Sequence, residues 1–479
     1  MRVLAIDQGT TNTKAVLVDA AGAILARASA PLATAYPRPG WAEQSASDIW
    51  TSVQAVISRI ATSHGTPDAI AIANQRETLV IWDAETSAPI CPAPIWQCRR
   101  TAEATARLIA KGHDPDVVAA TGLGINPLFP ASKLGWVLEN VAGARDLLKA
   151  GRLRAGTVDA WLLWNLTGGS VFATDHSNAS RTQLFDTRAM EFSSDLAALF
   201  GADTRCLPAP LASDSRFGAT AAGTTQLPPG VPVLAMMGDS HAALYGHGIR
   251  APGPVKATYG TGSSLMTLTA KRRASANGLS GTVAWTDRNG TAHALEGNIT
   301  VSAQAAAFMA SLLGLKDAAA LTELARTVPD SGGVSFVPAL AGLGAPHWDD
   351  RATGTITGMT HGTRPAHLAR AALEAIAHQI ADVFEAMERD IGHPLTGLRA
   401  DGGASGNADL MQMQADLLDR PVETADVEEI GALGVAAMAM ASQGVALALP
   451  EPSRHYRPVG NTRAVARAQW VAALRKTRA

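Results

Sequence analysis

A strand–turn–strand pattern that occurs twice, at the start of the chain and again past its middle, most constrains how this sequence can fold. The first occurrence consists of the apolar run Val3–Ile6, the polar turn Asp7–Asn12 and the apolar run Ala15–Val18. The second consists of Val255–Tyr259, the turn Gly260–Gly262 and Ser264–Leu268. Short apolar runs joined by a glycine-bearing turn are typical of β-hairpins. The sequence therefore predicts two α/β halves that each begin with a hairpin, which amounts to a weak internal repeat.

Helical and strand patterns alternate after the first hairpin. Apolar residues recur at helix spacing from Ile49 to Ile60, and Ser47-Asp48 just before them suggests an N-cap. Strand patterns return at Ala69–Ala73 and Leu79–Trp82. The mixture is typical of the α/β fold class.

A run rich in glycine and proline, residues 246–253, separates the two halves. Such runs are typical of connections between domains, and 479 residues are enough for two domains. We therefore predict an N-terminal domain at residues 1–245 and a C-terminal domain at residues 254–479. The second of these contains a long helical pattern from about His367 to Asp390.

Composition argues against several classes of partner and site. The chain has 40 Lys and Arg residues against 42 Asp and Glu residues, so its net charge of −2 gives no reason to expect nucleic acid or an anionic membrane surface. The three cysteines, Cys91, Cys98 and Cys206, are too few and too scattered for a disulfide framework or a zinc cluster. We expect them to be reduced thiols.

One segment is long and apolar enough to raise the question of a membrane span. Residues 430–450 carry no charge and could cross a bilayer. The segment is rich in Ala and Gly and lacks an aromatic belt, so we interpret it as a buried helix that passes close to other backbone. The N-terminal apolar run stops at Asp7, well short of a signal-peptide core. We expect a cytoplasmic protein with no membrane partner.

The two glycine-bearing turns are the first functional signal. Backbone N–H groups and threonine hydroxyls in such turns can meet phosphate oxygens without a Cβ in the way. Asp7, at the end of the first strand, could hold magnesium, which prefers carboxylate and water ligands, and Lys14 adds a positive charge nearby. Ordinary hairpin turns remain the alternative. The sequence contains neither a Walker A loop nor a GxGxxG fingerprint.

Two further segments place charged side chains at strand ends, where α/β proteins bind ligands. Asp239 follows the apolar strand Val231–Met237, so its carboxylate could accept a proton from a substrate hydroxyl. The alternative is a helix N-cap formed by Asp239 or Ser240. Arg76 and Glu77 offer fixed donors and acceptors for vicinal hydroxyls, although most such pairs are simply solvated.

A third segment runs from Leu398 to Gly403 and continues through Ala404–Asn407. A strand that leads into paired glycines lets a flat ligand such as adenine lie against the backbone, and an Asn side chain can both donate and accept hydrogen bonds. Strand–turn–helix junctions often contain Gly-Gly, so this segment alone is a weak signal.

Together these segments resemble the glycerol kinases, which are FGGY carbohydrate kinases within the wider superfamily of actin and hexokinase. The matching segments, in chain order, are Asp7–Thr11, Gly40–Gln44, Asn74–Thr78, Ile95–Thr101, Asn178–Thr182, Tyr259–Gly262, Leu343–Asp349 and Asp401–Gly403. Residues 354–374 look like the C-terminal signature of the family. The resemblance covers nearly the whole chain and keeps the family's order of motifs.

The resemblance implies two ribonuclease-H-like domains around a central cleft, with ATP and Mg²⁺ as cofactors. Asp239 matches the family's catalytic base, and Asp7 matches its magnesium-associated acid. The positions that match nucleotide contacts are Thr10, Lys14, Thr261, Gly262, Gly403 and Asn407. The positions that match acceptor contacts are Arg76, Glu77, Trp96 and Asp239.

The sequence departs from glycerol kinases at several of these positions. Leu128 stands where they carry Tyr, and Ser240 stands where they carry Gln, so this substrate pocket loses two hydrogen-bonding groups and gains volume. Lys14 stands where they usually carry Arg, and two nucleotide-side positions fall on Ala303 and Ala307.

We therefore expect an ATP-dependent kinase for a terminal hydroxyl of a small polyol or sugar, with glycerol the first candidate. A tetritol such as erythritol, or a ketose such as xylulose or dihydroxyacetone, is the alternative within this class. An actin-like, nucleotide-switched binding protein is the alternative from another class, and a pseudo-kinase that binds sugar without turnover is a third. Both a homodimer and a homotetramer remain open.

Overall fold

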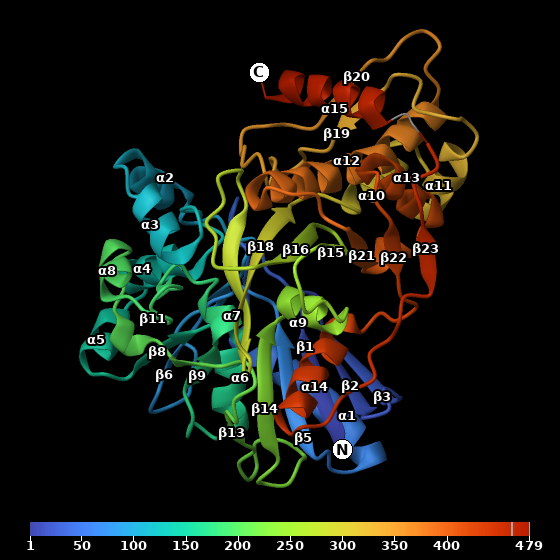
Figure 1. The fold of residues 1–479 in the computed structure, drawn as a ribbon. Helices are drawn as coiled ribbons and strands as arrows, with labels where there is room; N and C mark the ends of the chain where they lie inside the picture. The colour runs from blue at the N-terminus through green and yellow to red at the C-terminus, as the bar shows by residue number, and fades with distance from the viewer. Residues whose placement is uncertain (461–462, 479) are drawn as a thin grey trace.

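The computed structural model describes residues 1–460 and 463–478 of the chain, and its framework is a pair of β-sheets, one in each half (Figure 1). The first sheet has the strand order β13-β14-β5-β1-β2-β3. These strands are β13 (Gly218–Ala219), β14 (Pro232–Gly238), β5 (Ala69–Asn74), β1 (Arg2–Gln8), β2 (Asn12–Asp19) and β3 (Ile24–Pro31). Strand β1 pairs antiparallel with β2 and parallel with β5, and β5 in turn pairs parallel with β14.

The second sheet has the order β17-β18-β16-β15-β21-β22-β23. Its strands are β17 (Ser280–Asp287), β18 (Gly290–Ile299), β16 (Ser263–Thr269), β15 (Pro254–Tyr259), β21 (Gly397–Asp401), β22 (Val422–Thr424) and β23 (Arg454–Tyr456). Strand β15 pairs antiparallel with β16 and parallel with β21, which pairs parallel with β22. The series β18-β16-β15-β21-β22 thus repeats the series β3-β2-β1-β5-β14. Both predicted hairpins and the internal repeat are confirmed, as two ribonuclease-H-like sheets.

Helices cover the outer faces of both sheets and fill the space between them. Helices α1 (Ala46–His64) and α6 (Val158–Leu166) pack on one face of the first sheet. The second sheet's outer face is covered by α10 (Gln304–Leu312), α11 (Ala318–Ala325), α12 (Pro365–Ile391), α13 (Ala408–Leu418) and α15 (Arg463–Thr477). Between the sheets lie α9 (Asp239–Gly246) and α14 (Ile430–Ser442), as Figure 1 shows.

Helix α14 belongs to the C-terminal half of the sequence but packs against strands of the first sheet. Its residues share an apolar cluster with Val3 and Ala5 of β1 and with Leu244 of α9. A Cβ on Gly434 would lie 1.8 Å from the carbonyl oxygen of Ala242, so the two helices approach closely at a position where only glycine fits. The prediction of a buried helix in close contact with other backbone is confirmed. Among the described residues, no helix combines the length and hydropathy needed to cross a bilayer.

Shorter strands and helices complete the two halves. The smaller strands are β4 (Glu43–Gln44), β6 (Val80–Asp83), β7 (Ala93–Pro94), β8 (Leu153–Gly156), β9 (Ala173–Asp175), β10 (Phe185–Asp186), β11 (Glu191–Phe192), β12 (Ala209–Leu211), β19 (Ser335–Val337) and β20 (Thr355–Thr357). The smaller helices are α2 (Ala102–Ala110), α3 (Asp114–Thr121), α4 (Pro130–Asn140), α5 (Ala144–Lys149), α7 (His176–Ala179) and α8 (Ser194–Leu199).

The prediction of an N-cap at Ser47-Asp48 is wrong, because α1 begins earlier. The hydroxyl of Ser45 accepts from the backbone N–H of Asp48, so Ser45 is the N-cap and Ser47-Asp48 already lie inside the helix. The run 45–48 contains two serines and an aspartate, each of which can cap a helix, so the sequence alone does not tell which of them is the N-cap.

Candidate active site

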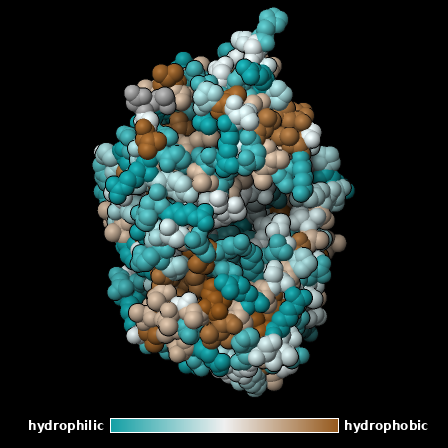
Figure 2. All heavy atoms as spheres, turned by 90° about the vertical axis from the view of Figure 1, so that its right-hand side faces the viewer, coloured by the Kyte–Doolittle hydropathy of each residue, from teal (hydrophilic) through white to brown (hydrophobic). Residues whose placement is uncertain are grey.

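The ends of three neighbouring parallel strands bring the predicted catalytic residues together. In the register of the first sheet, Gln8 of β1 and Gly238 of β14 both lie level with Asn74 of β5. Asp7 is therefore at the same sheet edge as Asp239, because carboxyl ends of parallel strands share one edge. The space-filling view shows one face hollowed near its middle, with hydrophilic residues around the hollow (Figure 2).

Asp239 is held from one side and open on the other. Its Oδ1 atom accepts from Nε of Arg76 at 2.8 Å, and its side chain remains 39% exposed. Asp239 is the first residue of α9, where the helix dipole favours a negative charge. The N-cap position is Gly238, so the alternative role of Asp239 or Ser240 as N-cap is not what the structure has.

Asp7 is a carboxylate in an unfavourable environment for its charge. Burial raises its pKa to about 7, and the nearby carboxylates of Asp239 and Asp401 add to the effect, while Lys14 opposes it. A cation beside Asp7 would relieve this cost. Among the described residues, no group of three or more His, Cys, Asp or Glu side chains is arranged to hold a metal by itself. The environment of Asp7 fits Mg²⁺, which keeps several waters and binds through one or two carboxylates together with phosphates.

A buried ion network fixes the guanidinium of Arg76. Besides Asp239, it donates through Nη1 to Oε1 of Glu296 at 2.5 Å. Arg181 donates through Nε to Oε1 of Glu77 at 2.7 Å, and its Nη2 lies 2.9 Å from Oε2 of Glu296. Burial alone would raise the pKa of Glu296, but the guanidiniums of Arg181 and Arg76 hold it well below its usual range. Because Glu296 comes from β18 of the second sheet, the network joins the two halves beneath the site.

Ser240 takes part in the same network. It is only 6% exposed, and its hydroxyl accepts from Arg76 and from Nζ of Lys256 at 3.2 Å each while donating to Ser264 at 3.0 Å. The extra pocket volume expected from a serine here is therefore occupied by protein groups. Ser240 accepts from Arg76 and so helps to orient it.

Trp96 and Thr10 are in direct contact. The indole Nε1 of Trp96 donates to the hydroxyl of Thr10 at 2.9 Å. Trp96 was predicted for the acceptor side and Thr10 for the phosphate side. Their hydrogen bond puts these two predicted sites next to each other at the first hairpin.

A buried lysine ties the predicted acceptor residues to one another. The ammonium of Lys133 in α4 donates to the carbonyl oxygens of Leu128 at 2.7 Å, Ile95 at 2.8 Å and Glu77 at 3.1 Å. Leu128 is half-buried and Lys133 has no exposed surface. Burial lowers the pKa of Lys133 to about 7. Lys133 therefore fixes the loop of Leu128 against the neighbours of Trp96 and Arg76.

The other predicted nucleotide contacts fall on the second hairpin, on the segment after β21 and on strand β2. Thr261 is exposed at the tip of the second hairpin, and a Cβ on Gly262 would lie 2.4 Å from the carbonyl oxygen of Ile299. Gly403 is exposed after β21. Asn407 caps α13 by accepting from two backbone N–H groups, and its amide donates to Thr322 at 2.9 Å, so its polar atoms already have partners. Lys14 is 44% exposed and lies 3.8 Å from Glu428.

Sequence reasoning missed the residues that hold the site together, namely Arg181, Glu296, Lys256, Ser264 and Lys133. Arg181 lies in the segment Asn178–Thr182, which resembles the kinase family, and this was the available signal; Glu296 lies outside the segments that carry the resemblance. Their partners are more than a hundred residues away in the sequence, so a single chain without structure gives no sign that their charges are buried together.

Comparison with known proteins supports one family over both halves. Residues 2–246 match the N-terminal domain of the FGGY family of carbohydrate kinases, and residues 255–443 match its C-terminal domain. The apulose kinase of Pectobacterium atrosepticum is 47% identical over 437 residues, which are 91% of this chain and 88% of that protein. The glycerol kinase of Symbiobacterium thermophilum is 42% identical over 98% of this chain and 99% of its own length.

A solved structure extends the agreement to three dimensions. The crystal structure of Plasmodium falciparum glycerol kinase with ADP superposes with a TM-score of 0.93 at 28% identity, covering 99% of this chain and 98% of that one. The two-domain architecture is therefore shared over the whole length.

Proposed function

Because this chain belongs to the FGGY family of carbohydrate kinases, we propose that it uses Asp239 as the base that deprotonates a terminal hydroxyl of glycerol for phosphorylation by ATP. The family settles the class of reaction: the protein is an ATP-dependent carbohydrate or polyol kinase. The residue roles and the choice of glycerol are the proposal.

The observation that carries the role of Asp239 is its asymmetric environment. Arg76, itself buried, fixes one carboxylate oxygen, while the side chain stays 39% exposed at the strand edge shared with Asp7. A base for phosphoryl transfer must be oriented and yet open to the acceptor hydroxyl. The hydroxyl proton would pass to the carboxylate of Asp239 as the hydroxyl oxygen bonds to the γ-phosphorus of ATP, while the bond from that phosphorus to the β–γ bridging oxygen breaks and ADP leaves.

We assign the phosphates of ATP to the side of Trp96 that faces away from the acceptor. Asp7 would hold Mg²⁺, whose chemistry is to neutralise charge on the phosphate oxygens. Thr10, Lys14, Thr261 and Gly262 would contact phosphates from the two hairpins, and Gly403 with Asn407 would contact adenosine. The exposed tip of the second hairpin supports this arrangement.

The acceptor is assigned to the space between Trp96, Arg76 and Asp239. Arg76 and Glu77 would bind its hydroxyl groups, and Trp96 would lie against its carbon chain. Glycerol is favoured because the glycerol kinase relative matches the chain over almost its whole length.

A ketose is the second candidate, and a specific residue favours it. Leu128 removes the hydroxyl that glycerol kinases place in this pocket, and the relative at 47% identity is named as an apulose kinase. A pocket that loses one hydrogen bond and gains space accepts a larger substrate at modest cost.

Steady-state ATP consumption with glycerol, erythritol, dihydroxyacetone, xylulose and apulose tests the proposal. We expect the highest kcat/KM with glycerol and little turnover without an acceptor. In Leu128→Tyr, kcat/KM for glycerol should rise and that for the pentuloses should fall, since the added ring fills the space that a longer carbon chain needs. A wild type that prefers a pentulose by tenfold or more would replace glycerol with the second candidate. No acceptor-dependent ATP consumption with any of the five would contradict both.

We further propose a cytoplasmic location, supported by three cysteines that are all free thiols in the structure. A homodimer or a homotetramer is the expected assembly, and sedimentation velocity distinguishes the two.

A further inference from the structure

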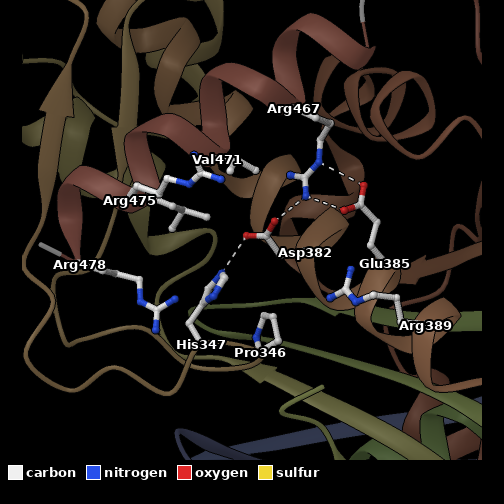
Figure 3. A pocket seen from close by; sticks show the side chains of 10 residues that line it. Pro346, His347, Asp382, Glu385, Arg389, Arg467, Val471, Arg475 and Arg478 are labelled. Atoms are coloured by element: carbon white, nitrogen blue, oxygen red, sulfur yellow. Dashed lines mark hydrogen bonds and ion pairs between the residues drawn. The ribbon is translucent and has the colours of Figure 1, made fainter. Parts of the chain in front are cut away.

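A cavity of about 450 Å³ lies in the C-terminal half, where α15 crosses α12 beside the loop of Pro346 and His347. None of the predicted catalytic, acceptor or nucleotide residues lines it. Its lining is unusual in charge, because four arginines surround it: Arg389, Arg467, Arg475 and Arg478. We call this cavity the arginine pocket (Figure 3).

The two carboxylates at the floor of the arginine pocket already have partners. Arg467 contacts Asp382 at 2.5 Å and Glu385 at 2.9 Å. Trp470 donates to Asp382 at 2.8 Å, and Nε2 of His347 lies 3.2 Å from the same carboxylate. Burial would raise the pKa of Asp382, but the bond to His347 and the charge of Arg467 hold it below its usual range. The acidic groups are thus neutralised within the protein, so the floor offers no site for a cation.

The three other arginines retain most of their hydrogen-bonding capacity. Arg389, from α12, donates through Nε to the side-chain oxygen of Asn277 at 3.1 Å. Arg478 has one contact with a carboxylate, to Asp349 at 3.3 Å. Arg475 forms no ion pair with any residue that the structure describes. In Figure 3 these side chains surround the space in front of Asp382, with Arg389 on one side and Arg475 and Arg478 on the other.

We propose that the arginine pocket binds a small soluble anion that carries a phosphate group. Guanidinium groups present planar pairs of N–H donors that match phosphate oxygens, and a phosphate has enough oxygens to meet several guanidiniums at once. The volume is in the range of small-molecule sites. A dicarboxylate offers the same charge but a different arrangement of oxygens, so phosphate is the better match to arginines that approach from different sides.

Isothermal titration calorimetry with inorganic pyrophosphate tests this, in the presence of excess ADP, Mg²⁺ and glycerol so that the catalytic site is filled. We expect one additional binding event in the wild-type protein. Arg475→Ala and Arg389→Ala should each weaken it by at least about tenfold, because each removes a charge-assisted contact. Both variants should keep wild-type turnover, which shows that they fold.

Lys476→Ala is the matched control. Lys476 is exposed on the same helix next to Arg475 and carries the same charge, but it does not line the cavity. Binding in Lys476→Ala should equal that of the wild type. An equal loss in Lys476→Ala and Arg475→Ala would overturn the proposal in favour of nonspecific attraction by the positive helix, and absence of the binding event in the wild type would overturn it outright.

Two further arms identify the anion and its source. Malonate, a dicarboxylate of similar size, should bind at least about tenfold more weakly than pyrophosphate, and equal binding would overturn the assignment to phosphate. Sedimentation with phosphatidylglycerol vesicles should leave the protein in the supernatant. Vesicle binding that Arg475→Ala abolishes, without pyrophosphate binding, would show a membrane surface instead.

Discussion

At the scale of the residue, Asp239 and Arg76 depend on each other. Asp239→Asn should lower kcat by ~10²–10⁴ while leaving nucleotide affinity largely intact, because an amide keeps the shape but cannot take the proton. Steady-state kinetics with ADP binding measured in parallel checks this. Asp186→Asn is the control: Asp186 lies on β10 and pairs with Arg188, and its replacement should leave kcat unchanged. A value of kcat above half that of the wild type would remove Asp239 from the role of base.

Arg76→Ala should raise KM for the acceptor far more than KM for ATP. A hydrogen bond from a charged group contributes about 1.5–3 kcal/mol, which corresponds to a tenfold change or more. The structure adds a second effect: Glu296 loses one of its two arginine partners and becomes a partly uncompensated buried charge, so the variant should also unfold more easily.

The double variant Arg76→Ala with Glu296→Gln separates the two effects. Removing the stranded charge should recover part of the lost stability but none of the lost affinity for the acceptor. Equal changes in both KM values, or recovery of acceptor affinity together with stability, would assign Arg76 a purely structural role.

Asp239 and Arg76 could be named as candidates from the sequence because each lies in a short local motif with a recognisable chemistry, and Trp96 because its segment resembles the kinase family; their roles stay predictions. The sequence did not suffice for Arg181 or Lys133. Their roles come from burial against distant segments, and a charged residue in a sequence is ordinarily assigned to the surface. The same limit applies to Ser240, which was predicted to contact substrate but is enclosed by Arg76, Lys256 and Ser264.

At the scale of the element, Lys133 makes the stability of the α4 region depend on pH. Its pKa of about 7 in the folded protein is below the ordinary 10.5, so the cost of burying its charge is fully present below pH 7 and is relieved as pH rises toward 10.5. Between pH 7 and pH 9 the unfolded state binds more protons. The free energy of unfolding should therefore rise by about 2 kcal/mol in the wild type relative to Lys133→Met.

Urea denaturation of both proteins at pH 7 and pH 9 measures this difference. Lys149→Met, at a lysine that is 78% exposed, is the control and should show no such relative change. A difference between wild type and Lys133→Met that stays constant or shrinks with pH would mean that Lys133 keeps its proton when folded.

The contact between α9 and α14 admits no side chain at Gly434. Gly434→Ala would place a methyl group against the carbonyl of Ala242, and the helices must separate to accept it. Overpacking of this kind costs about 1–3 kcal/mol or more. Because α9 begins with Asp239, the shift should also lower kcat.

Thermal unfolding together with turnover tests Gly434→Ala, with Ser442→Ala at the end of the same helix as the control. A Gly434→Ala protein as stable and as active as wild type would show that the two helices can separate without affecting the position of Asp239.

At the scale of the whole molecule, two halves joined beneath a cleft imply closure on binding, with the hinge near residues 246–253. Small-angle scattering should give a smaller radius of gyration with nucleotide and acceptor together than without ligands. The Arg76–Glu296 and Arg181–Glu296 contacts should persist in the open and the closed protein, because these buried ion pairs join the two halves. An unchanged radius at saturating ligand would contradict closure.

The general architecture was predictable because it rests on two local hairpins and on alternating patterns. The proposed division at residues 1–245 and 254–479 separates the two sheets, although residue 479 lies outside the described part of the chain. A boundary drawn along the sequence cannot show that α14 returns to the first sheet, since the apolar pattern of a helix does not say which surface it will cover.

That return of α14 bears on how the protein is made. A ribosome completes the six strands of the first sheet long before it reaches Ile430, so the face that α14 covers stays exposed while most of the second sheet is being synthesised. Apolar surface left open during synthesis is prone to aggregation and attracts chaperones. The N-terminal half is therefore expected to become stable only after nearly the whole chain has emerged, and a nascent chain cut short before Ile430 is expected to be degraded.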